Sequence, residues 1–128
     1  MAAQLHLHIL EGELGICRLD AVSPIPGWAA ESPFYSVTRT PDELSIVTGA
    51  RAIPAGMQVD AGWRAIQLVG SFDFSLIGIM LSVLAPLANA GISVLAVSTF
   101  DTDYVLVKEA RLDEAIAALT QAGHTISG

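Results

Sequence analysis

Apolar and polar residues alternate along short stretches in the first half of the chain, which is the pattern of a strand with one buried face. In the first stretch, leucine and isoleucine alternate with His6 and His8. Residues 14–19, 34–39 and 43–48 are rich in alternating, aromatic or β-branched residues, and a Thr-Pro-Asp turn sequence separates the last two stretches. The pattern predicts two strands, a connection and then a β-hairpin.

Prolines and glycines interrupt this half of the chain in two places. Residues 22–28 contain two prolines, so we expect only one short helical turn in the connection. Residues 49–62 lose their periodicity and gather three glycines and a proline, which leaves room for one short extended segment. We therefore predict a boundary near residue 60, with a strand-rich unit over residues 1–60 and a second unit over residues 61–128.

The second half begins with an apolar, strand-like stretch over residues 65–69 and then changes to a helical pattern. Apolar residues recur there at three- and four-residue spacing, so one face of the helix should lie on the sheet. That face contains Ile77, Met80, Leu81, Leu84, Leu87 and Ala88.

The two ends of this helix carry local signals. Asp73 or Ser75 can cap its first turn, and Gly91 can adopt the left-handed conformation that closes its last turn. Pro86 has no backbone N–H to donate to the Ser82 carbonyl, so we expect a bend near the end of the helix.

Two short strands, a second helix and a final strand complete the chain. Residues 92–97 and 104–107 are apolar and β-branched, and the polar turn sequence at 101–103 predicts a hairpin between them. Residues 112–122 form an amphipathic helical pattern, and residues 124–127 a short strand. The resulting β-α-β-β-α-β order predicts an α+β fold of the ferredoxin-like type, with an antiparallel sheet and the helices on one face.

The composition of the chain indicates which partners and which cellular compartment to expect. The chain of 128 residues is 52% hydrophobic, which is enough for a sizeable core, and its net charge of -7 comes with six scattered basic residues. Such a surface would repel a phosphate backbone, so we expect no nucleic-acid partner. A lone cysteine and an N-terminus without a secretory signal pattern favour a cytoplasmic protein.

One long uncharged stretch, residues 74–100, has the length of a membrane span. Pro86, Asn89, Gly91 and Ser93 divide it into a helix and a strand, and no basic residues flank it. We therefore expect no membrane segment.

Catalytic and metal-binding motifs are not evident in the sequence. There is no Gly-x-Ser-x-Gly elbow, no Gly-rich phosphate loop and no metal-ligand spacing, and Cys17 lies in an apolar stretch where an inert buried thiol is expected. His6 and His8 project to one side of a strand but lack a third ligand nearby, so a polar strand face is favoured. We expect no enzyme activity, cofactor or metal.

The second half resembles an ACT domain, a small regulatory module that binds amino acids in metabolic enzymes. The resemblance covers residues 63–127 and rests on Leu-Ile-Gly at 76–78 and Leu-Ala-Asn-Ala-Gly-Ile-Ser at 87–93. Further segments resemble, in one order, a bacterial tandem-ACT family related to the cytosolic arginine sensors of animal cells. They are Glu-Leu-Ser-Ile-Val at 43–47, Gly-Trp-Arg-Ala-Ile at 62–66, Phe-Asp-Phe-Ser at 72–75, and Ser-Thr-Phe-Asp-Thr-Asp-Tyr-Val-Leu-Val-Lys at 98–108. This resemblance implies tandem ACT-like units, the first of which is divergent and lacks a full-length helix around residues 24–28.

The resemblance also implies where a ligand would bind, because ACT ligands sit where the first strand–helix loop meets a neighbouring unit. A helix start offers unpaired N–H groups to an α-carboxylate. Gly78 would let another backbone approach closely, and Asp73 or Asp101 could receive an ammonium group. The candidate residues are Ser71, Phe72, Asp73, Ile77, Gly78, Thr99, Phe100, Asp101, Glu43 and Ser45.

Structural roles remain open for the same residues. Asp73 could only cap the helix, Asp101 could only form the turn, and the aromatic residues could belong to the core or an interface. Glu43 and Ser45 could simply lie on an exposed hairpin face.

We interpret the chain as a small-molecule sensor that binds an amino acid between its units, has no catalytic activity and forms a homodimer. Two alternatives stay open at this point. The ACT surface could serve assembly alone, or a small enzyme could have its site at a dimer interface.

Overall fold

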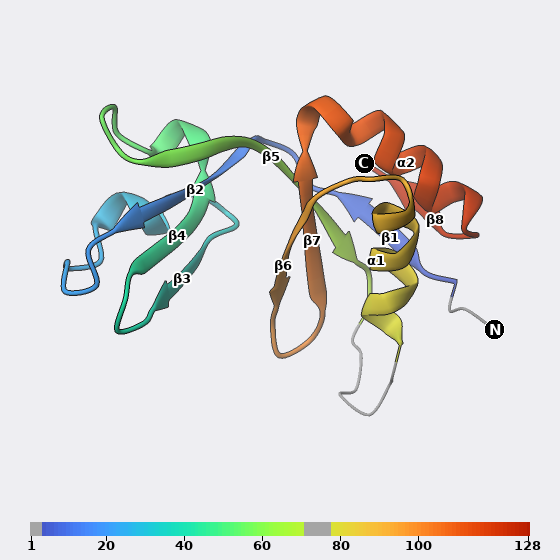
Figure 1. Cartoon of the computed structure of the whole chain (residues 1–128), viewed down its shortest axis with the longest axis horizontal. Coiled ribbons are helices and arrows are strands. Elements are labelled where there is room, and N and C mark those ends of the chain that lie inside the picture. The colour runs from blue at the N-terminus through green and yellow to red at the C-terminus, as the bar shows by residue number, and fades with distance from the viewer. Residues whose placement is uncertain (1–3, 71–77) are drawn as a thin grey trace. The chain divides into compact units, whose positions relative to one another are not determined.

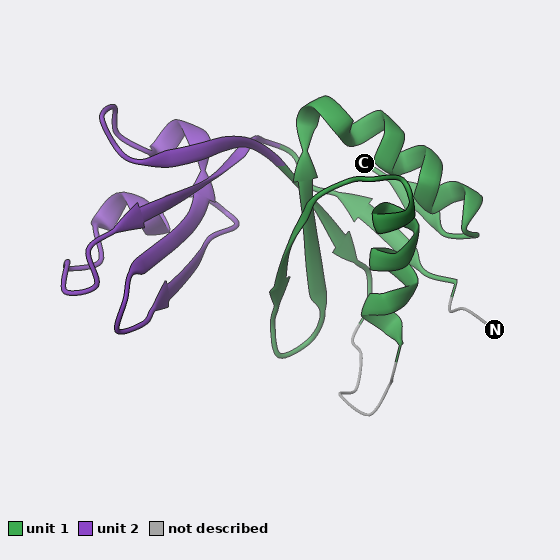
Figure 2. Ribbon diagram, viewed as in Figure 1, with its two compact units in different colours: residues 1–11, 64–128 green, residues 12–63 purple. Residues whose placement is uncertain are grey.

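The computed structural model describes residues 4–70 and 78–128, and the chain divides into two compact units (Figure 2). Unit 1 contains residues 1–11 and 64–128, and unit 2 contains residues 12–63. The sequence pattern predicts one unit over residues 1–60. In the structure, residues 1–11 belong to unit 1, because they contain a strand of its sheet.

Unit 1 has the predicted β-α-β-β-α-β order with one additional strand (Figure 1). Its elements are β5 (Val59–Leu68), α1 (Ile79–Asn89), β6 (Val94–Ser98), β7 (Asp103–Lys108), α2 (Leu112–Gln121) and β8 (Thr125–Ser127), and the additional strand is β1 (His6–Ile9). β7 pairs with β5 and with β6, whereas β1 pairs with β5 antiparallel and with β8 in parallel. The N-terminal strand therefore lies between β5 and β8 in this sheet.

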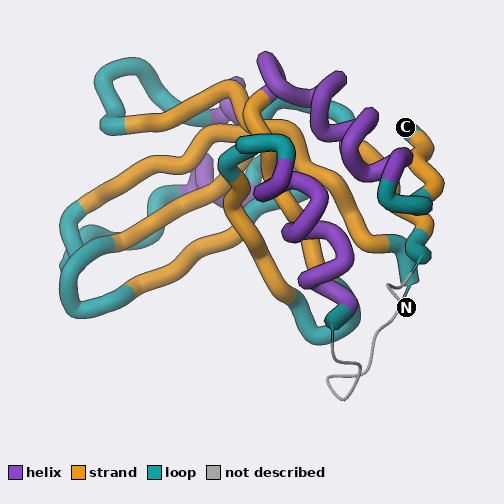
Figure 3. Tube along the Cα trace, turned by 45° about the vertical axis from the view of Figure 1, so that its right-hand side comes forward, coloured by secondary structure: helices purple, strands orange, loops and turns teal. Residues whose placement is uncertain are grey.

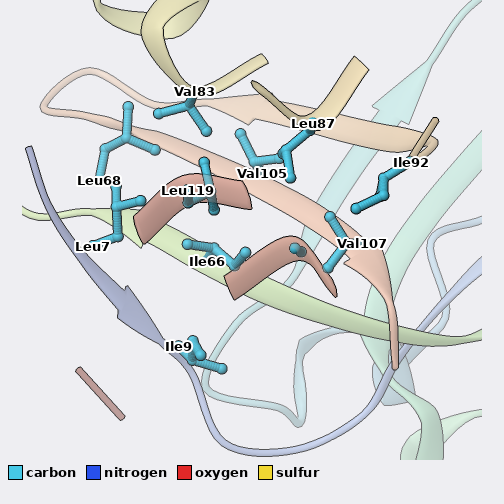
Figure 4. Close-up of a cluster of buried hydrophobic side chains, with 11 residues drawn as sticks. Leu7, Ile9, Ile66, Leu68, Val83, Leu87, Ile92, Val105, Val107 and Leu119 are labelled. Carbon is cyan, nitrogen blue, oxygen red and sulfur yellow. The ribbon is translucent and has the colours of Figure 1, made fainter. Parts of the chain in front are cut away.

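Both helices of unit 1 cover the same face of its sheet, as predicted (Figure 3). Alternate residues of three strands point toward them and form one core with the inward side chains of the helices (Figure 4). The buried members are Leu7, Ile9, Ile66, Leu68, Val105 and Val107 of the strands, Val83 and Leu87 of α1, Ala115 and Leu119 of α2, and Ile92 before β6. Burial of this apolar surface is the main contribution to the stability of the unit.

The buried face of α1 agrees with the predicted one in part. Leu87 is buried, and Met80 and Leu84 pack against the core, as expected. Leu81 is 65% exposed and Ala88 is exposed, whereas Val83 is fully buried. Nearly every residue of α1 is apolar, so spacing alone does not select one face. Among the residues that the structure describes, neither α-helix is long and apolar enough to cross a membrane.

The last turn of α1 shows how the protein compensates for the missing N–H of Pro86, while the expected bend stays a prediction. The Nε2 atom of His124 lies 2.8 Å from the carbonyl oxygen of Ser82, which receives no N–H from Pro86. The Leu5 N–H donates to Nδ1 of His124 at 3.0 Å, so Nδ1 is the acceptor and Nε2 carries the proton. The buried His124 therefore links β8, α1 and the segment before β1.

The ends of α1 are set by glycines. Gly91 adopts a φ of 73°, as predicted, and Ile92 N–H donates to the Leu87 carbonyl at 3.0 Å. The helix begins at Ile79, with Gly78 as its N-cap. The predicted caps Asp73 and Ser75 lie outside the described residues.

Unit 2 is an antiparallel sheet with short helical turns. Its strands are β2 (Leu14–Leu19), β3 (Ser36–Arg39), β4 (Leu44–Gly49) and the first part of β5, in the order β3-β4-β2-β5, and its 3-10 turns cover Gly27–Ala30 and Ala50–Ala52. The predicted hairpin and the single helical turn are confirmed. The short extended segment expected before residue 62 is the start of β5, which is longer than predicted.

The core of unit 2 lies on one face of this sheet. Cys17, Ala29, Leu44 and Ile46 are buried together, and partly buried residues pack around them: Leu19, Trp28, Val37 and Ile53. Alternate residues of β2 and β4 therefore face away from this core.

Candidate functional site

Four of the predicted site residues lie at one end of unit 1. Gly78 starts α1, and the β6–β7 hairpin carries Thr99, Phe100 and Asp101 at its tip. The buried hydroxyl of Thr102 donates to the Leu68 carbonyl, which holds the hairpin tip beside the end of β5. The start of α1 lies at the same end of the unit (Figures 1 and 3). Ser71, Phe72, Asp73 and Ile77 lie outside the described residues.

Gly78 has a conformational role of its own. Its φ is 88°, which side-chain-bearing residues rarely adopt. No heavy atom of the described residues lies within 4 Å of where a Cβ would stand, so the close approach of another backbone stays a prediction. The first intrahelical bond runs from Ser82 N–H to the Gly78 carbonyl at 3.0 Å. The N–H groups before Ser82 have no acceptor within the helix, which gives this end a partial positive charge.

At the hairpin tip, one polar side chain holds the turn and another is exposed to solvent. The Thr99 hydroxyl donates to the Thr102 carbonyl at 3.0 Å and accepts from the Thr102 N–H at 3.2 Å, so it holds the turn. Phe100 is 85% exposed. Asp101 is exposed, and within the described residues its carboxylate makes no hydrogen bond. Of these three residues, Asp101 is therefore the one best placed to receive a ligand.

The other two predicted residues, Glu43 and Ser45, line a pocket of about 310 Å³ in unit 2. The pocket spans β4, β2 and β5, and its other lining residues are Ile16, Cys17, Arg18, Gln58, Val59 and Asp60. Ser45 pairs with Arg18 across β4 and β2, and Asp60 pairs with Ile16 across β5 and β2. Sequence reasoning missed Arg18, Gln58 and Asp60, because only the pairing of β2 with both neighbours brings them together.

Cys17 lies on the core face of β2 and is 1% exposed, which confirms the predicted buried thiol. Burial raises the pKa of the Cys17 thiol, so less of it is thiolate at neutral pH. We expect alkylation by iodoacetamide to be at least about tenfold slower in the folded protein than in urea, as measured by mass spectrometry over time. Equal rates in the two states would show that the thiol is accessible.

The histidine pair on β1 faces hydroxyl groups of β8. His6 lies 3.0 Å from both the Thr125 and the Ser127 hydroxyls, and Nδ1 of His8 lies 3.1 Å from the Ser127 hydroxyl. These contacts match a polar strand face. Within residues 4–70 and 78–128, no three His, Cys, Asp or Glu side chains are grouped so that they could hold a metal ion.

Comparison with protein families divides the chain much as the structure does. A family model described as the ACT domain matches residues 58–121, which is half of the chain. A second model, for an N-terminal domain, matches residues 12–56, which fall within unit 2.

Curated relatives include the cytosolic arginine sensor for mTORC1 subunit 1. The mouse (Mus musculus) protein is 34% identical over 69% of this chain and 30% of its own length. The rat (Rattus norvegicus) protein is 33% identical over 91% of this chain and 42% of its own length. The chain thus spans less than half of these relatives.

Solved structures share the fold. A crystal structure from Agrobacterium tumefaciens is 44% identical and covers 99% of this chain and 96% of its own, with a TM-score of 0.94. The ligand-free regulatory subunit of aspartate kinase from Thermus thermophilus covers 94% of this chain and 99% of its own at 14% identity, with a TM-score of 0.63. At that identity the second likeness concerns the fold alone.

Proposed function

This chain belongs to the ACT-domain family, and from that premise we propose that it is a non-catalytic regulatory protein that binds an amino acid. The observation that carries the proposal is the end of unit 1, where the start of α1 and an exposed aspartate lie on the unit that the ACT model matches. Among the described residues, no side chain caps this helix start. The relatives named as arginine sensors support a ligand of this class.

The chemistry of this end suits the two charges of an amino acid. The first N–H groups of α1, which have no acceptor within the helix, can bind the α-carboxylate. Asp101 can receive the ammonium group or a cationic side chain, while Thr99 keeps the hairpin in place and Phe100 adds apolar contact. We include Ser71, Phe72, Asp73 and Ile77 in the proposed site because they belong to the connection between β5 and α1.

Regulation follows if the bound and free forms differ in affinity for a partner or for a second copy of the chain. A ligand can shift such an equilibrium only by its differential affinity for the two arrangements. We propose a cytoplasmic homodimer as the responding assembly, since open sheet edges are commonly covered by pairing between copies.

Thermal unfolding with each of the twenty amino acids tests this function. A ligand present at about 100 times its dissociation constant stabilises the folded state by about 2.7 kcal/mol, so one amino acid or one chemical group of them should raise Tm by roughly 5–10 °C. The Asp101→Asn variant should need about ten times more ligand for the same rise in Tm, because a charge-assisted hydrogen bond is lost.

Asp113→Asn is the matched control, because Asp113 is an exposed aspartate of the same unit at the start of α2. Each variant is compared with its own ligand-free Tm. If folded, ligand-free protein shows no shift with any amino acid, the sensor function is wrong and a role in assembly alone takes its place.

A further inference from the structure

Two histidines of β1 lie on the face of the unit 1 sheet that is opposite the helices. Leu7 and Ile9 belong to the core that the sheet shares with α1 and α2. The residues that alternate with them, His6 and His8, therefore point to the other face. His6 is exposed and His8 is partly buried.

The last strand completes this cluster of side chains. β8 pairs with β1 in parallel, with Thr125 beside His6 and Ser127 beside His8. Ile126 lies between them and packs against the core, so both hydroxyl groups share the face of the histidines. The contacts join residues that are 119 to 121 positions apart in the chain, which is why the sequence shows no further ligand next to the two histidines.

One nitrogen of each imidazole points at the same atom. Nε2 of His6 lies 3.0 Å from the Ser127 hydroxyl oxygen, and Nδ1 of His8 lies 3.1 Å from it. A zinc ion that two imidazoles share lies about 2.0–2.1 Å from each nitrogen, so each ring needs to move by only about 1 Å to bind an ion at this point. Side-chain torsions allow such a movement while the strands keep their places.

The second nitrogen of His6 has a partner of the kind that metal-binding histidines have. Nδ1 of His6 lies 3.0 Å from the Thr125 hydroxyl oxygen, which can accept its proton. A proton on Nδ1 leaves the lone pair of Nε2 available to an ion. The same hydrogen bond fixes the orientation of the ring and makes Nε2 a better ligand. Thr125 is therefore a positioning residue in this arrangement, and His6 and His8 are the ligands.

We propose that His6 and His8 bind a divalent transition-metal ion of the group Zn²⁺, Ni²⁺ and Cu²⁺. Imidazole nitrogen suits these ions, whereas Mg²⁺ and Ca²⁺ prefer oxygen ligands. The Ser127 hydroxyl and water take the remaining positions around the ion. With two imidazoles the site binds more weakly than a structural zinc site, which has four protein ligands.

The charges of the chain favour a cation at this place. β1 and β8 contain no lysine or arginine, and the whole chain has a net charge of -7. β8 is the last strand in the order β5-β1-β8, so it lies at an edge of the sheet. An ion bound by the two histidines and Ser127 links this edge strand to β1 and stabilises the folded form of unit 1.

Titration of the full, isotope-labelled chain with zinc chloride, followed by NMR of the histidine rings, tests the site. At about pH 7.5 an ordinary imidazole is mostly neutral and can bind the ion. The ring signals of His6 and His8 should shift together along one saturable curve, while those of the buried His124 stay in place. His6→Gln and His8→Gln should each weaken binding by at least about tenfold, since each removes one of the two ligands.

Two controls separate this site from loose binding to an acidic surface. Mg²⁺ carries the same charge as Zn²⁺ but should leave the ring signals in place. Asp113→Asn removes an exposed carboxylate of the same unit and should leave the zinc curve unaltered.

Three results would refute the site. The first is that the ring signals of the folded protein do not move at about 1 mM Zn²⁺, where even millimolar binding would be visible. The second is that Mg²⁺ moves them as far as Zn²⁺ does. The third is that only one of the two histidine substitutions weakens binding, because a single imidazole is then the ligand. The metal site shares no residue with the proposed amino-acid site, so the two proposals can fail separately.

Discussion

Replacement of His124 by phenylalanine is expected to lower the free energy of unfolding of unit 1 by about 2–4 kcal/mol. Phenylalanine fills a similar volume but has no nitrogen, so two groups would lose their partner. These are the Ser82 carbonyl, which receives nothing from Pro86, and the Leu5 N–H. Each such group costs about 1–3 kcal/mol when it is buried and unsatisfied.

A second substitution separates this explanation from a simple loss of packing. Pro86→Ala restores a backbone N–H that can donate to the Ser82 carbonyl, so His124→Phe should cost about 1 kcal/mol less in the Pro86→Ala background. His6→Phe is the control, because His6 is an exposed histidine on β1 and its loss should change stability by only about 0.5 kcal/mol.

The measurement is urea unfolding followed by two signals. Both described α-helices belong to unit 1, and both tryptophans, Trp28 and Trp63, belong to unit 2. Far-UV circular dichroism therefore reports mainly on unit 1, and tryptophan fluorescence on unit 2. If His124→Phe lowers the free energy of unfolding equally in the wild-type and the Pro86→Ala backgrounds, the role assigned to His124 is wrong.

Leu87→Ala should lower the free energy of unfolding of unit 1 by about 3–4 kcal/mol, as followed by the helical circular dichroism signal. Leu87 is fully buried in the core that α1 shares with the sheet and α2, and its truncation leaves a cavity there (Figure 4). Leu81→Ala makes the same chemical change on the same helix. Because Leu81 is 65% exposed, this substitution should lower the free energy of unfolding by only about 0.5 kcal/mol. Similar losses in the two variants would mean that another face of α1 is buried.

The pattern of polar and apolar residues predicted most of the elements, because period and turn residues are local properties. The strand at β2, the β3–β4 hairpin, the second hairpin and the helix α2 all lie within a few residues of their predicted places. Gly91 also behaves as predicted, since its left-handed conformation depends on its own backbone chemistry.

Other features depend on contacts between distant parts of the chain. The alternation around His6 and His8 predicted a strand but did not indicate that β1 would insert between β5 and β8. The helix α1 is apolar nearly all round, so its spacing placed Leu81 rather than Val83 on the sheet. His124 carries no motif, and its role follows only from where β8 meets α1.

The candidate site stays a prediction. Resemblance to ACT domains placed ten residues in one site, and two of the elements that carry them, the start of α1 and the tip of the β6–β7 hairpin, lie at the same end of unit 1. Ser71, Phe72, Asp73 and Ile77 lie outside the described residues. The pocket around Glu43 and Ser45 needed Arg18 from another strand, and strand pairing across 27 residues of chain is not readable from local pattern.

Amide NMR of the full chain, titrated with the twenty amino acids, tests the central claim most directly. The account predicts that at least one amino acid shifts the amides at the start of α1 and at the tip of the β6–β7 hairpin, residues 78–80 and 99–101, with one saturable curve. It also predicts that Asp101→Asn weakens this curve while Asp113→Asn does not. If those amides of the folded, ligand-free protein do not move with any amino acid, the protein is not an amino-acid sensor of the kind proposed.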